Sequence, residues 1–206
     1  MEQHHTITFE GHTLHYRDEG KENKQTIVLI HGFLQNLSIW SSYTLSYMRS
    51  MHVIAIDLPG HGYSDCFSEA HTMDFMAKCI MAVLTAAGVE QCVMVGHSLG
   101  GYVALAFAER YPFMLKGLCL INSHAFADTE EKKESRVEVC KKVQVNRPGF
   151  IVDFIPNLFS ESRREALSAE IKEIQDQSLD VSEQSIIAAQ YGMMQRPSRI
   201  ALLQRF

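Results

Sequence analysis

The chain has 206 residues, of which 46% are apolar and 21% charged, a composition typical of a soluble globular domain with a substantial core. Its formal net charge of −5 gives no basic field, so we expect no nucleic-acid partner. No apolar run reaches the roughly 18 residues of a membrane span, and no signal-peptide pattern is visible. The five cysteines are odd in number and lack metal-site spacing, so we expect a reduced, cytoplasmic protein without metal or cofactor.

Strand and helix patterns alternate through the first part of the chain. Residues 5–11 and 12–20 alternate apolar and polar side chains around Gly11, which predicts an antiparallel hairpin at a sheet edge. Four apolar runs predict buried strands: 26–32, 52–62, 91–96 and 115–123. Helical patterns fall between them, at 33–50, 71–87 and 99–112. The sequence therefore predicts an α/β fold with a mostly parallel sheet and helices on both faces.

The pattern changes after Ser123, where charged residues become denser and strand-like runs stop. Leu167, Ile171 and Ile174 recur at helical spacing, and residues 180–192 begin with a capping pair and end at a glycine. Short amphipathic helices of this kind predict a cap over the sheet. We therefore divide the chain into a core, residues 1–123, and a helical cap region, residues 124–206.

One motif carries chemistry. Gly96-His97-Ser98-Leu99-Gly100 matches G-x-S-x-G and lies between a predicted strand and a predicted helix. The turn is sharp, and glycines at the flanking positions relieve its crowding. Ser98 would then stand at the carboxyl edge of the sheet and at a helix N-terminus, where developing negative charge is favoured. It is the candidate nucleophile.

Three segments in this order, "HGF" (31–33), "DLPGHGYSD" (57–65) and "GHSLGGYVAL" (96–105), resemble the α/β-hydrolase superfamily. Within it, they are most similar to small cytosolic carboxylesterases of the pimeloyl-carrier-protein methyl ester esterase type. The resemblance covers roughly residues 4–127, and the cap matches with much weaker specificity.

The resemblance implies a role for each matched position. Ser98 would attack the carbonyl carbon of a small ester or thioester, and the backbone N–H groups of Phe33 and Leu99 would form the oxyanion hole. Epoxide hydrolases of the same fold carry aspartate at the elbow, so serine favours acyl chemistry.

Other residues near the motif have structural interpretations. His31 and His97 lie beside turn glycines, where we expect their rings to hydrogen-bond the backbone. Asp57 and His61 are expected to brace a neighbouring loop. We predict that the substrate pocket is lined by Gly32, Trp40, His97, His124 and Met193, although Trp40 is equally suited to helix packing.

The expected base is missing. In this superfamily an acid and a histidine follow the nucleophile beyond the cap, yet the last histidine here is His124. Three explanations stay open: a truncated chain, a fragment completed by a second chain, or a short protein without hydrolytic activity. We expect the intact enzyme to supply both residues in a further strand–helix–strand unit, and this chain alone to be inactive. His124 with Asp128 is an alternative base and acid.

The sequence leaves the oligomeric state and the reaction type open. The strand at 115–123 would be an unpaired apolar edge, which predicts marginal stability or an oligomer. The elbow is also shared by C–C bond hydrolases, lyases, acyltransferases and non-catalytic binding proteins of this fold, so the motif alone does not choose among them.

Overall fold

A computed structural model describes residues 4–205, which form a single six-stranded sheet of order β1-β2-β4-β3-β5-β6. The first two strands make the predicted antiparallel hairpin, and β2 pairs antiparallel with β4. The pairs β3–β4, β3–β5 and β5–β6 are parallel. The predicted fold class is confirmed. The strands are β1 His4–Phe9, β2 His12–Glu19, β3 Thr26–Ile30, β4 His52–Ile56, β5 Cys92–His97 and β6 Leu115–Ile121.

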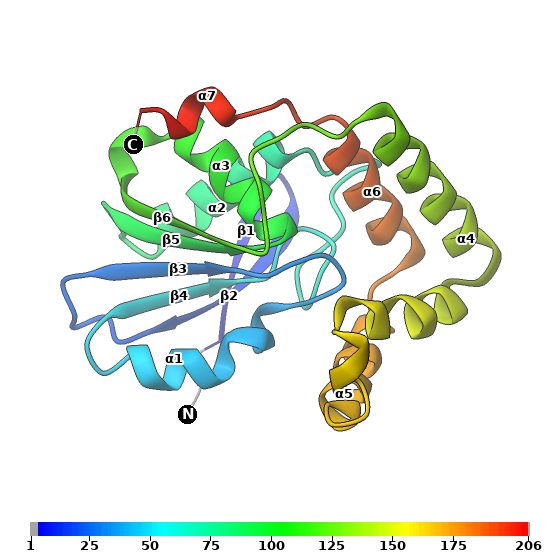
Figure 1. Ribbon diagram of the computed structural model, residues 1–206. Helices are drawn as coiled ribbons and strands as arrows, with labels where there is room; N and C mark the ends of the chain where they lie inside the picture. The colour runs from blue at the N-terminus through cyan, green and yellow to red at the C-terminus, as the bar shows by residue number, and fades with distance from the viewer. Residues whose placement is uncertain (1–3, 206) are drawn as a thin grey trace.

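Helices cover both faces of the sheet (Figure 1). On one face lie α2 (Met73–Ala86) and α3 (Leu99–Arg110), and on the other lie η1 (Leu37–Trp40) and α1 (Ser41–Tyr47). Each face of the sheet packs against its helices in a separate hydrophobic core. Side chains of β3 alternate between these two cores, because successive residues of a strand point to opposite faces. Val28 and Ile30 join the α2–α3 core, while Ile27 and Leu29 join Trp40 on the α1 side. Burial on both faces explains the continuous apolar runs in the sequence.

The cap follows the carboxyl end of β6 and lies beside that end of the sheet (Figure 1). Its first helix is longer than the short helices that we predicted, and it is kinked. Asn146 has non-helical backbone angles (φ −155°, ψ 81°), and Pro148 follows within the same element. The cap has a small core of its own, to which Leu34 of the sheet domain contributes. The cap elements are α4 Glu130–Phe154, η3 Ile155–Leu158, η4 Glu161–Arg163, α5 Ser168–Ser178 and α6 Glu183–Met194.

The last described residues return from the cap to the core. Helix α7 (Ile200–Leu203) lies over α3 (Figure 1), and Leu202 packs against Leu105 and Ala108. The Arg199 guanidinium binds carboxylates of α3 and α2, with 2.9 Å from Nε to Glu109 and 2.8 Å from an Nη to Asp74. The range 124–206, assigned to the cap from sequence, thus ends in a stretch that packs on the sheet domain.

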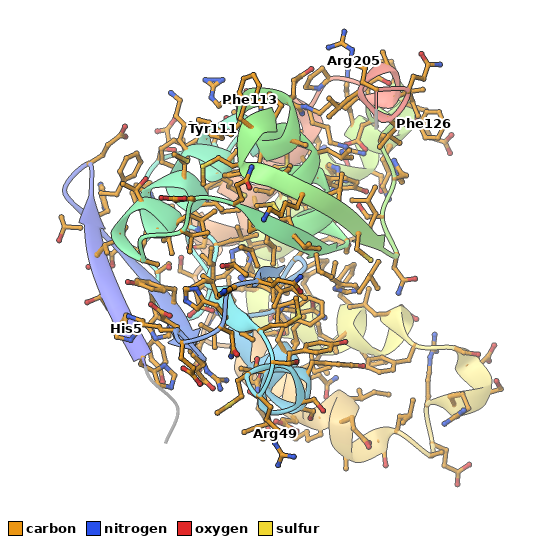
Figure 2. The ribbon with its side chains drawn as sticks, turned by 90° about the vertical axis from the view of Figure 1, so that its left-hand side faces the viewer. His5, Arg49, Tyr111, Phe113, Phe126 and Arg205 are labelled. Atoms are coloured by element: carbon orange, nitrogen blue, oxygen red, sulfur yellow. The ribbon has the colours of Figure 1, made fainter. Side chains whose placement is uncertain are left out.

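Strand β6 forms an edge of the sheet within residues 4–205, as predicted. Its apolar side chains are incompletely covered: Cys119 is exposed, and 37% of Ile121 is accessible. Phe113, in the short turn η2 (Pro112–Met114) before β6, is 91% exposed (Figure 2). A hollow of about 410 Å³ opens between β6 and Tyr43 of α1. Across the described residues, every helix is too short or too polar to span a bilayer.

Candidate active site

The elbow between β5 and α3 places Ser98 in a strained conformation. Its φ of 51° and ψ of −114° lie in a region that residues with a Cβ rarely adopt. Two hydrogen bonds fix the turn: the Ser98 N–H donates to the Ile121 carbonyl (2.9 Å), and the Ser123 hydroxyl donates to the Ser98 carbonyl (2.8 Å). Both partners lie at the carboxyl end of β6, so the edge strand holds the elbow.

Glycines at the elbow allow the helix to approach the sheet. A Cβ on Gly96 would lie 2.4 Å from the Gly100 carbonyl oxygen, and a Cβ on Gly100 would lie 2.5 Å from the Ile30 oxygen. Both obstacles are backbone atoms, which cannot rotate away. The sequence motif therefore reflects steric necessity at these two positions.

Ser98 is half-buried and lines a cavity of about 800 Å³ between the sheet and the cap. A volume of this size accommodates a substrate of ordinary metabolite size. The core contributes one side of the lining, and the cap contributes the other. The lining residues are Phe33, Gln35, His97, Ser98, Tyr102, Asn122, Lys132, Ser135, Arg136, Val139, Phe154, Leu158, Phe159, Ile174, Gln190 and Met193.

No hydrogen bond within residues 4–205 engages the backbone N–H groups of Phe33 and Leu99, and Phe33 lines the same cavity as Ser98. Leu99 is the first residue of α3, where N–H groups have no partner within the helix. Phe33 lies in the loop after β3, whose shape is fixed by a hydrogen bond from the Gly32 N–H to the Gln35 side chain (2.9 Å). The resemblance to the α/β-hydrolase superfamily implied that these two N–H groups form the oxyanion hole, and that role stays a prediction.

The histidines flanking the site are held in place by hydrogen bonds. In His31, Nδ1 donates to the Gly32 carbonyl (2.8 Å), and Nε2 accepts the Leu58 N–H (2.9 Å). Burial lowers the His31 pKa, which keeps this ring neutral. His97 instead contacts the Gln35 side chain through Nδ1 (2.9 Å), and burial lowers its pKa too. The predicted backbone bonding is thus confirmed for His31 and wrong for His97.

Asp57 braces the loops around the site, as predicted. Its carboxylate accepts the backbone N–H groups of Leu37 (2.8 Å) and Tyr63 (3.0 Å) and contacts His15 Nδ1 (2.6 Å). Burial by itself raises the pKa of Asp57, but the His15 contact and the other hydrogen bonds bring that pKa below its ordinary value. The neighbouring His61 is buried, and desolvation lowers its pKa to about 3.

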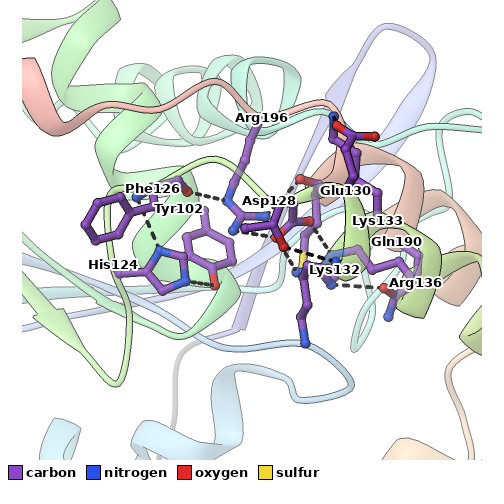
Figure 3. Close-up of polar contacts among 12 residues, drawn as sticks. Tyr102, His124, Phe126, Asp128, Glu130, Lys132, Lys133, Arg136, Gln190 and Arg196 are labelled. Carbon is purple, nitrogen blue, oxygen red and sulfur yellow. Dashed lines mark hydrogen bonds and ion pairs between the residues drawn. The ribbon is translucent and has the colours of Figure 1, made fainter.

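His124 and Asp128 do not form the alternative base–acid pair (Figure 3). His124 Nε2 lies 3.2 Å from the Tyr102 hydroxyl, and its Nδ1 accepts the Phe126 N–H. The Asp128 carboxylate instead binds Arg136 (2.6 Å) and Arg196 (2.8 Å). Within residues 4–205, no group contacts the Ser98 hydroxyl as a base.

Of the other residues predicted to line the substrate pocket, some line the cavity and some do not. Met193 lines the cavity with Ser98, while Gly32, Trp40 and His124 are not among its lining residues. Trp40 faces the hollow beside β6, and His124 borders a small crevice near Arg196. Trp40 is buried in the core under α1, the packing role that the sequence allowed.

Sequence reasoning missed several residues that shape the site. Gln35 links the loop after β3 to His97, and Ser123 anchors the elbow. The cap residues Lys132 and Arg136 also reach the cavity. These two residues are four apart on α4, a spacing that puts both on one face of a helix, but no sequence signal showed that this face meets the cavity.

Residues 25–142 match the family described as alpha/beta hydrolase fold. The chain belongs to this family. A solved structure of a thermophilic esterase from Thermogutta terrifontis, with malate bound, is 32% identical with a TM-score of 0.89. The alignment covers 97% of this chain and 75% of that esterase. An enol-lactonase from Burkholderia xenovorans LB400 shares the fold, at 20% identity and a TM-score of 0.86 over 94% of this chain and 75% of its own.

Among curated proteins, Epoxide hydrolase 4 from Mus musculus is 33% identical over 116 residues, which are 54% of this chain and 32% of that protein. A dihydrolipoyllysine-residue acetyltransferase component of an acetoin cleaving system from Pseudomonas putida is also 33% identical, over 55% of this chain and 30% of its own. The matches span about a third of these relatives. The relatives differ in reaction, so the family establishes a hydrolase fold, and the chemistry must come from the site.

Proposed function

We propose that the intact protein is a serine hydrolase that cleaves a carboxylic ester or thioester through an acyl-enzyme. The observation that carries this proposal is the placement of Ser98. It stands on a strained elbow and lines the cavity, Leu99 with its unbonded N–H is the next residue, and Phe33, whose N–H is also unbonded, lines the same cavity. Unpaired donors at the position of a developing oxyanion are the main source of rate enhancement in acyl transfer.

The proposed reaction has two stages. The Ser98 hydroxyl loses its proton to a base as its oxygen bonds to the carbonyl carbon, and the N–H groups of Phe33 and Leu99 stabilise the oxyanion. Collapse of this intermediate breaks the bond to the alcohol or thiol, which leaves with the proton. Water then attacks the acyl-enzyme, releasing the acid and regenerating the serine.

We also propose that the base and its orienting acid come from outside this sequence, so that the chain alone is inactive. In support, His31 and His97 are held by other contacts, and His124 is bonded to Tyr102. The esterase that is 32% identical to this chain is longer, since the alignment covers only 75% of it.

The similarity to epoxide hydrolases suggests epoxide opening as a second possible reaction, and the serine at position 98 argues against it. Opening an epoxide through a covalent intermediate calls for a carboxylate at the elbow, where this chain has a hydroxyl. A non-catalytic role in ligand binding is the competing function, because it requires the cavity but no base.

A fluorophosphonate probe tests the proposal, because it reacts only with an activated serine. We expect the full gene product to be labelled and its Ser98→Ala variant to lose labelling. Ser135→Ala is the matched control, since Ser135 lines the same cavity from the cap, and it should keep labelling. A full gene product that resists the probe, yet is stabilised by a ligand, would instead establish the binding role.

For the cellular context, we propose a small-molecule substrate and a cytoplasmic location. All five cysteines are free thiols, which fits a reducing compartment. Because the β6 edge is apolar and partly exposed, we also propose that the isolated chain associates through this strand.

A further inference from the structure

The cap wall of the cavity is positively charged, although the chain as a whole is acidic. Lys132 and Arg136 line the cavity one helical turn apart on α4, with Ser135 between them. None of the lining residues within 4–205 is an aspartate or glutamate. In a chain with 24 acidic and 19 basic side chains, this local excess of positive charge is not a consequence of composition.

The charge near Arg136 is not neutralised by its partners. One carboxylate, Asp128, lies between two guanidinium groups, at 2.6 Å from Arg136 Nε and 2.8 Å from an Nη of Arg196. All three side chains are at least nine-tenths buried. Although burial alone raises the pKa of Asp128, the bonds from both arginines hold it below its ordinary value, so the carboxylate is charged. One positive charge therefore remains uncompensated in the cluster, an arrangement that favours an additional anion.

The two arginines differ in their surroundings. Arg196 donates to the backbone carbonyls of Phe126 (3.2 Å) and Met193 (2.9 Å), and its guanidinium lies 3.9 Å from the centre of the Tyr102 ring (Figure 3). Arg136 donates to Asp128 from Nε (2.6 Å) and Nη2 (3.5 Å), and to the Gln190 amide oxygen from Nη1 (3.0 Å). Gln190 itself lines the cavity. Each guanidinium thus has a partner at all three nitrogens and keeps two N–H groups, and of the two arginines only Arg136 is among the described residues that line the cavity.

A second part of the cavity is apolar. Phe33 of the core and Val139, Phe154, Leu158 and Ile174 of the cap line it. A ligand that fits both parts has a hydrocarbon chain and an anionic end. Lys132 adds a second cation, and its ammonium has no ion-pair partner within residues 4–205.

We propose that the substrate is an ester or thioester whose hydrocarbon chain carries a carboxylate, bound by Arg136 and Lys132 while the ester carbonyl lies at Ser98. This assignment rests on the proposed function and narrows its substrate class. The guanidinium supplies a planar pair of donors and the ammonium a point charge, a combination suited to a carboxylate.

Binding to the Ser98→Ala protein tests the anion subsite without turnover. Monomethyl adipate and dimethyl adipate differ only in the free carboxylate, so calorimetric titration isolates the charge. We expect the monoester to bind at least about tenfold more tightly. Lys132→Gln should weaken its binding about threefold to fivefold, as for a partly exposed ion pair. Lys133→Gln is the matched control, since Lys133 is adjacent, pairs with Glu130 and does not line the cavity; it should leave binding within about twofold.

Added sodium chloride should weaken binding of the monoester and leave the diester unchanged. Equal binding of the two esters, or equal effects of Lys132→Gln and Lys133→Gln, would overturn the subsite. Because Lys132 is exposed, its substitution leaves the fold intact, and loss of structure does not confuse the result.

Turnover by the full gene product then separates the two possible positions of the carboxylate. Hydrolysis of monomethyl adipate, and not of the acetate ester of hydroxyhexanoate, places the anion on the acyl side. The reverse preference places it on the alcohol side. If the monoester binds with the expected charge dependence but no ester is cleaved, the subsite stands and the hydrolase proposal fails. If neutral esters are cleaved and bound as well as charged ones, the hydrolase stands and the subsite fails.

Discussion

The close approach of α3 to the end of β3 at Gly100 predicts that a larger residue at this position destabilises the fold. An alanine Cβ at this position would lie 2.5 Å from the Ile30 carbonyl oxygen and 2.6 Å from that of His31. A carbon–oxygen contact needs about 3.3 Å, so the helix must retreat by roughly 0.8 Å. Such overpacking costs about 1–3 kcal/mol, and the better helix propensity of alanine offsets at most about 1 kcal/mol of it.

We therefore expect Gly100→Ala to lower the free energy of unfolding by about 1–2 kcal/mol. Gly117→Ala is the matched control, because its Cβ would meet only the Val93 methyl groups, at 3.6 and 3.7 Å. That is ordinary contact, and a strand alanine is as stable as glycine or slightly more stable.

Urea unfolding measures both variants. The single tryptophan, Trp40, is buried, so its fluorescence should follow the same transition as far-UV circular dichroism. The steric argument is refuted if Gly100→Ala unfolds within about 0.5 kcal/mol of the parent chain, or if Gly117→Ala is destabilised by the same amount.

Two further predictions concern buried charge. Burial lowers the His71 pKa to about 4, whereas an unfolded histidine titrates near 6.5, so the unfolded chain binds more protons between these values. The free energy of unfolding should therefore fall as the pH drops below about 6.5, by up to about 1.4 kcal/mol per pH unit from this residue. Urea titrations from about pH 7 to about pH 5 measure this dependence, and His71→Gln should reduce the slope of unfolding free energy against pH by that amount. Asp128→Asn leaves Arg136 and Arg196 without their shared carboxylate and should cost about 3–5 kcal/mol. The exposed Asp153→Asn should leave the melting temperature unchanged, and equal melting of both variants would show that the buried cluster contributes nothing.

The features that the sequence predicted are those set by local rules. A strand buried on both faces must be apolar throughout, as β3 is, and the glycine spacing of the elbow follows from contacts between neighbouring segments. The antiparallel β1–β2 hairpin was likewise predicted from the alternation of apolar and polar residues around Gly11. These patterns are readable because each depends on a short stretch of chain.

The features that the sequence did not predict depend on contacts between distant segments. His124 was a candidate base from sequence, but the Tyr102 hydroxyl and the Phe126 N–H occupy both of its ring nitrogens. The return of the last residues to α3 depends on Arg199 reaching Glu109, 90 positions earlier. No periodicity encodes such pairings, since they depend on where the cap settles on the sheet domain.

Backbone strain connects the fold to the proposed chemistry. Leu34, Ser98 and Asn122 all have positive φ, and they follow β3, β5 and β6 at the carboxyl end of the sheet. Strain of about 1–3 kcal/mol for such a residue persists only where surrounding contacts impose it. At Ser98 those contacts are the Ile121 carbonyl and the Ser123 hydroxyl.

Ser98→Gly should release this strain, because glycine adopts positive φ readily. Against the release stands the greater backbone entropy of unfolded glycine, about 0.5–1 kcal/mol, so we expect a net gain of about 1 kcal/mol in urea unfolding. Ser98→Ala is the control: it also removes the hydroxyl but keeps the Cβ, so the strain stays. If the two variants are equally stable, the turn is unstrained and the geometry would not distinguish this serine from one at any helix start. If only glycine stabilises, the fold sacrifices stability to direct the Ser98 hydroxyl into the cavity, a sacrifice that the proposed nucleophile explains.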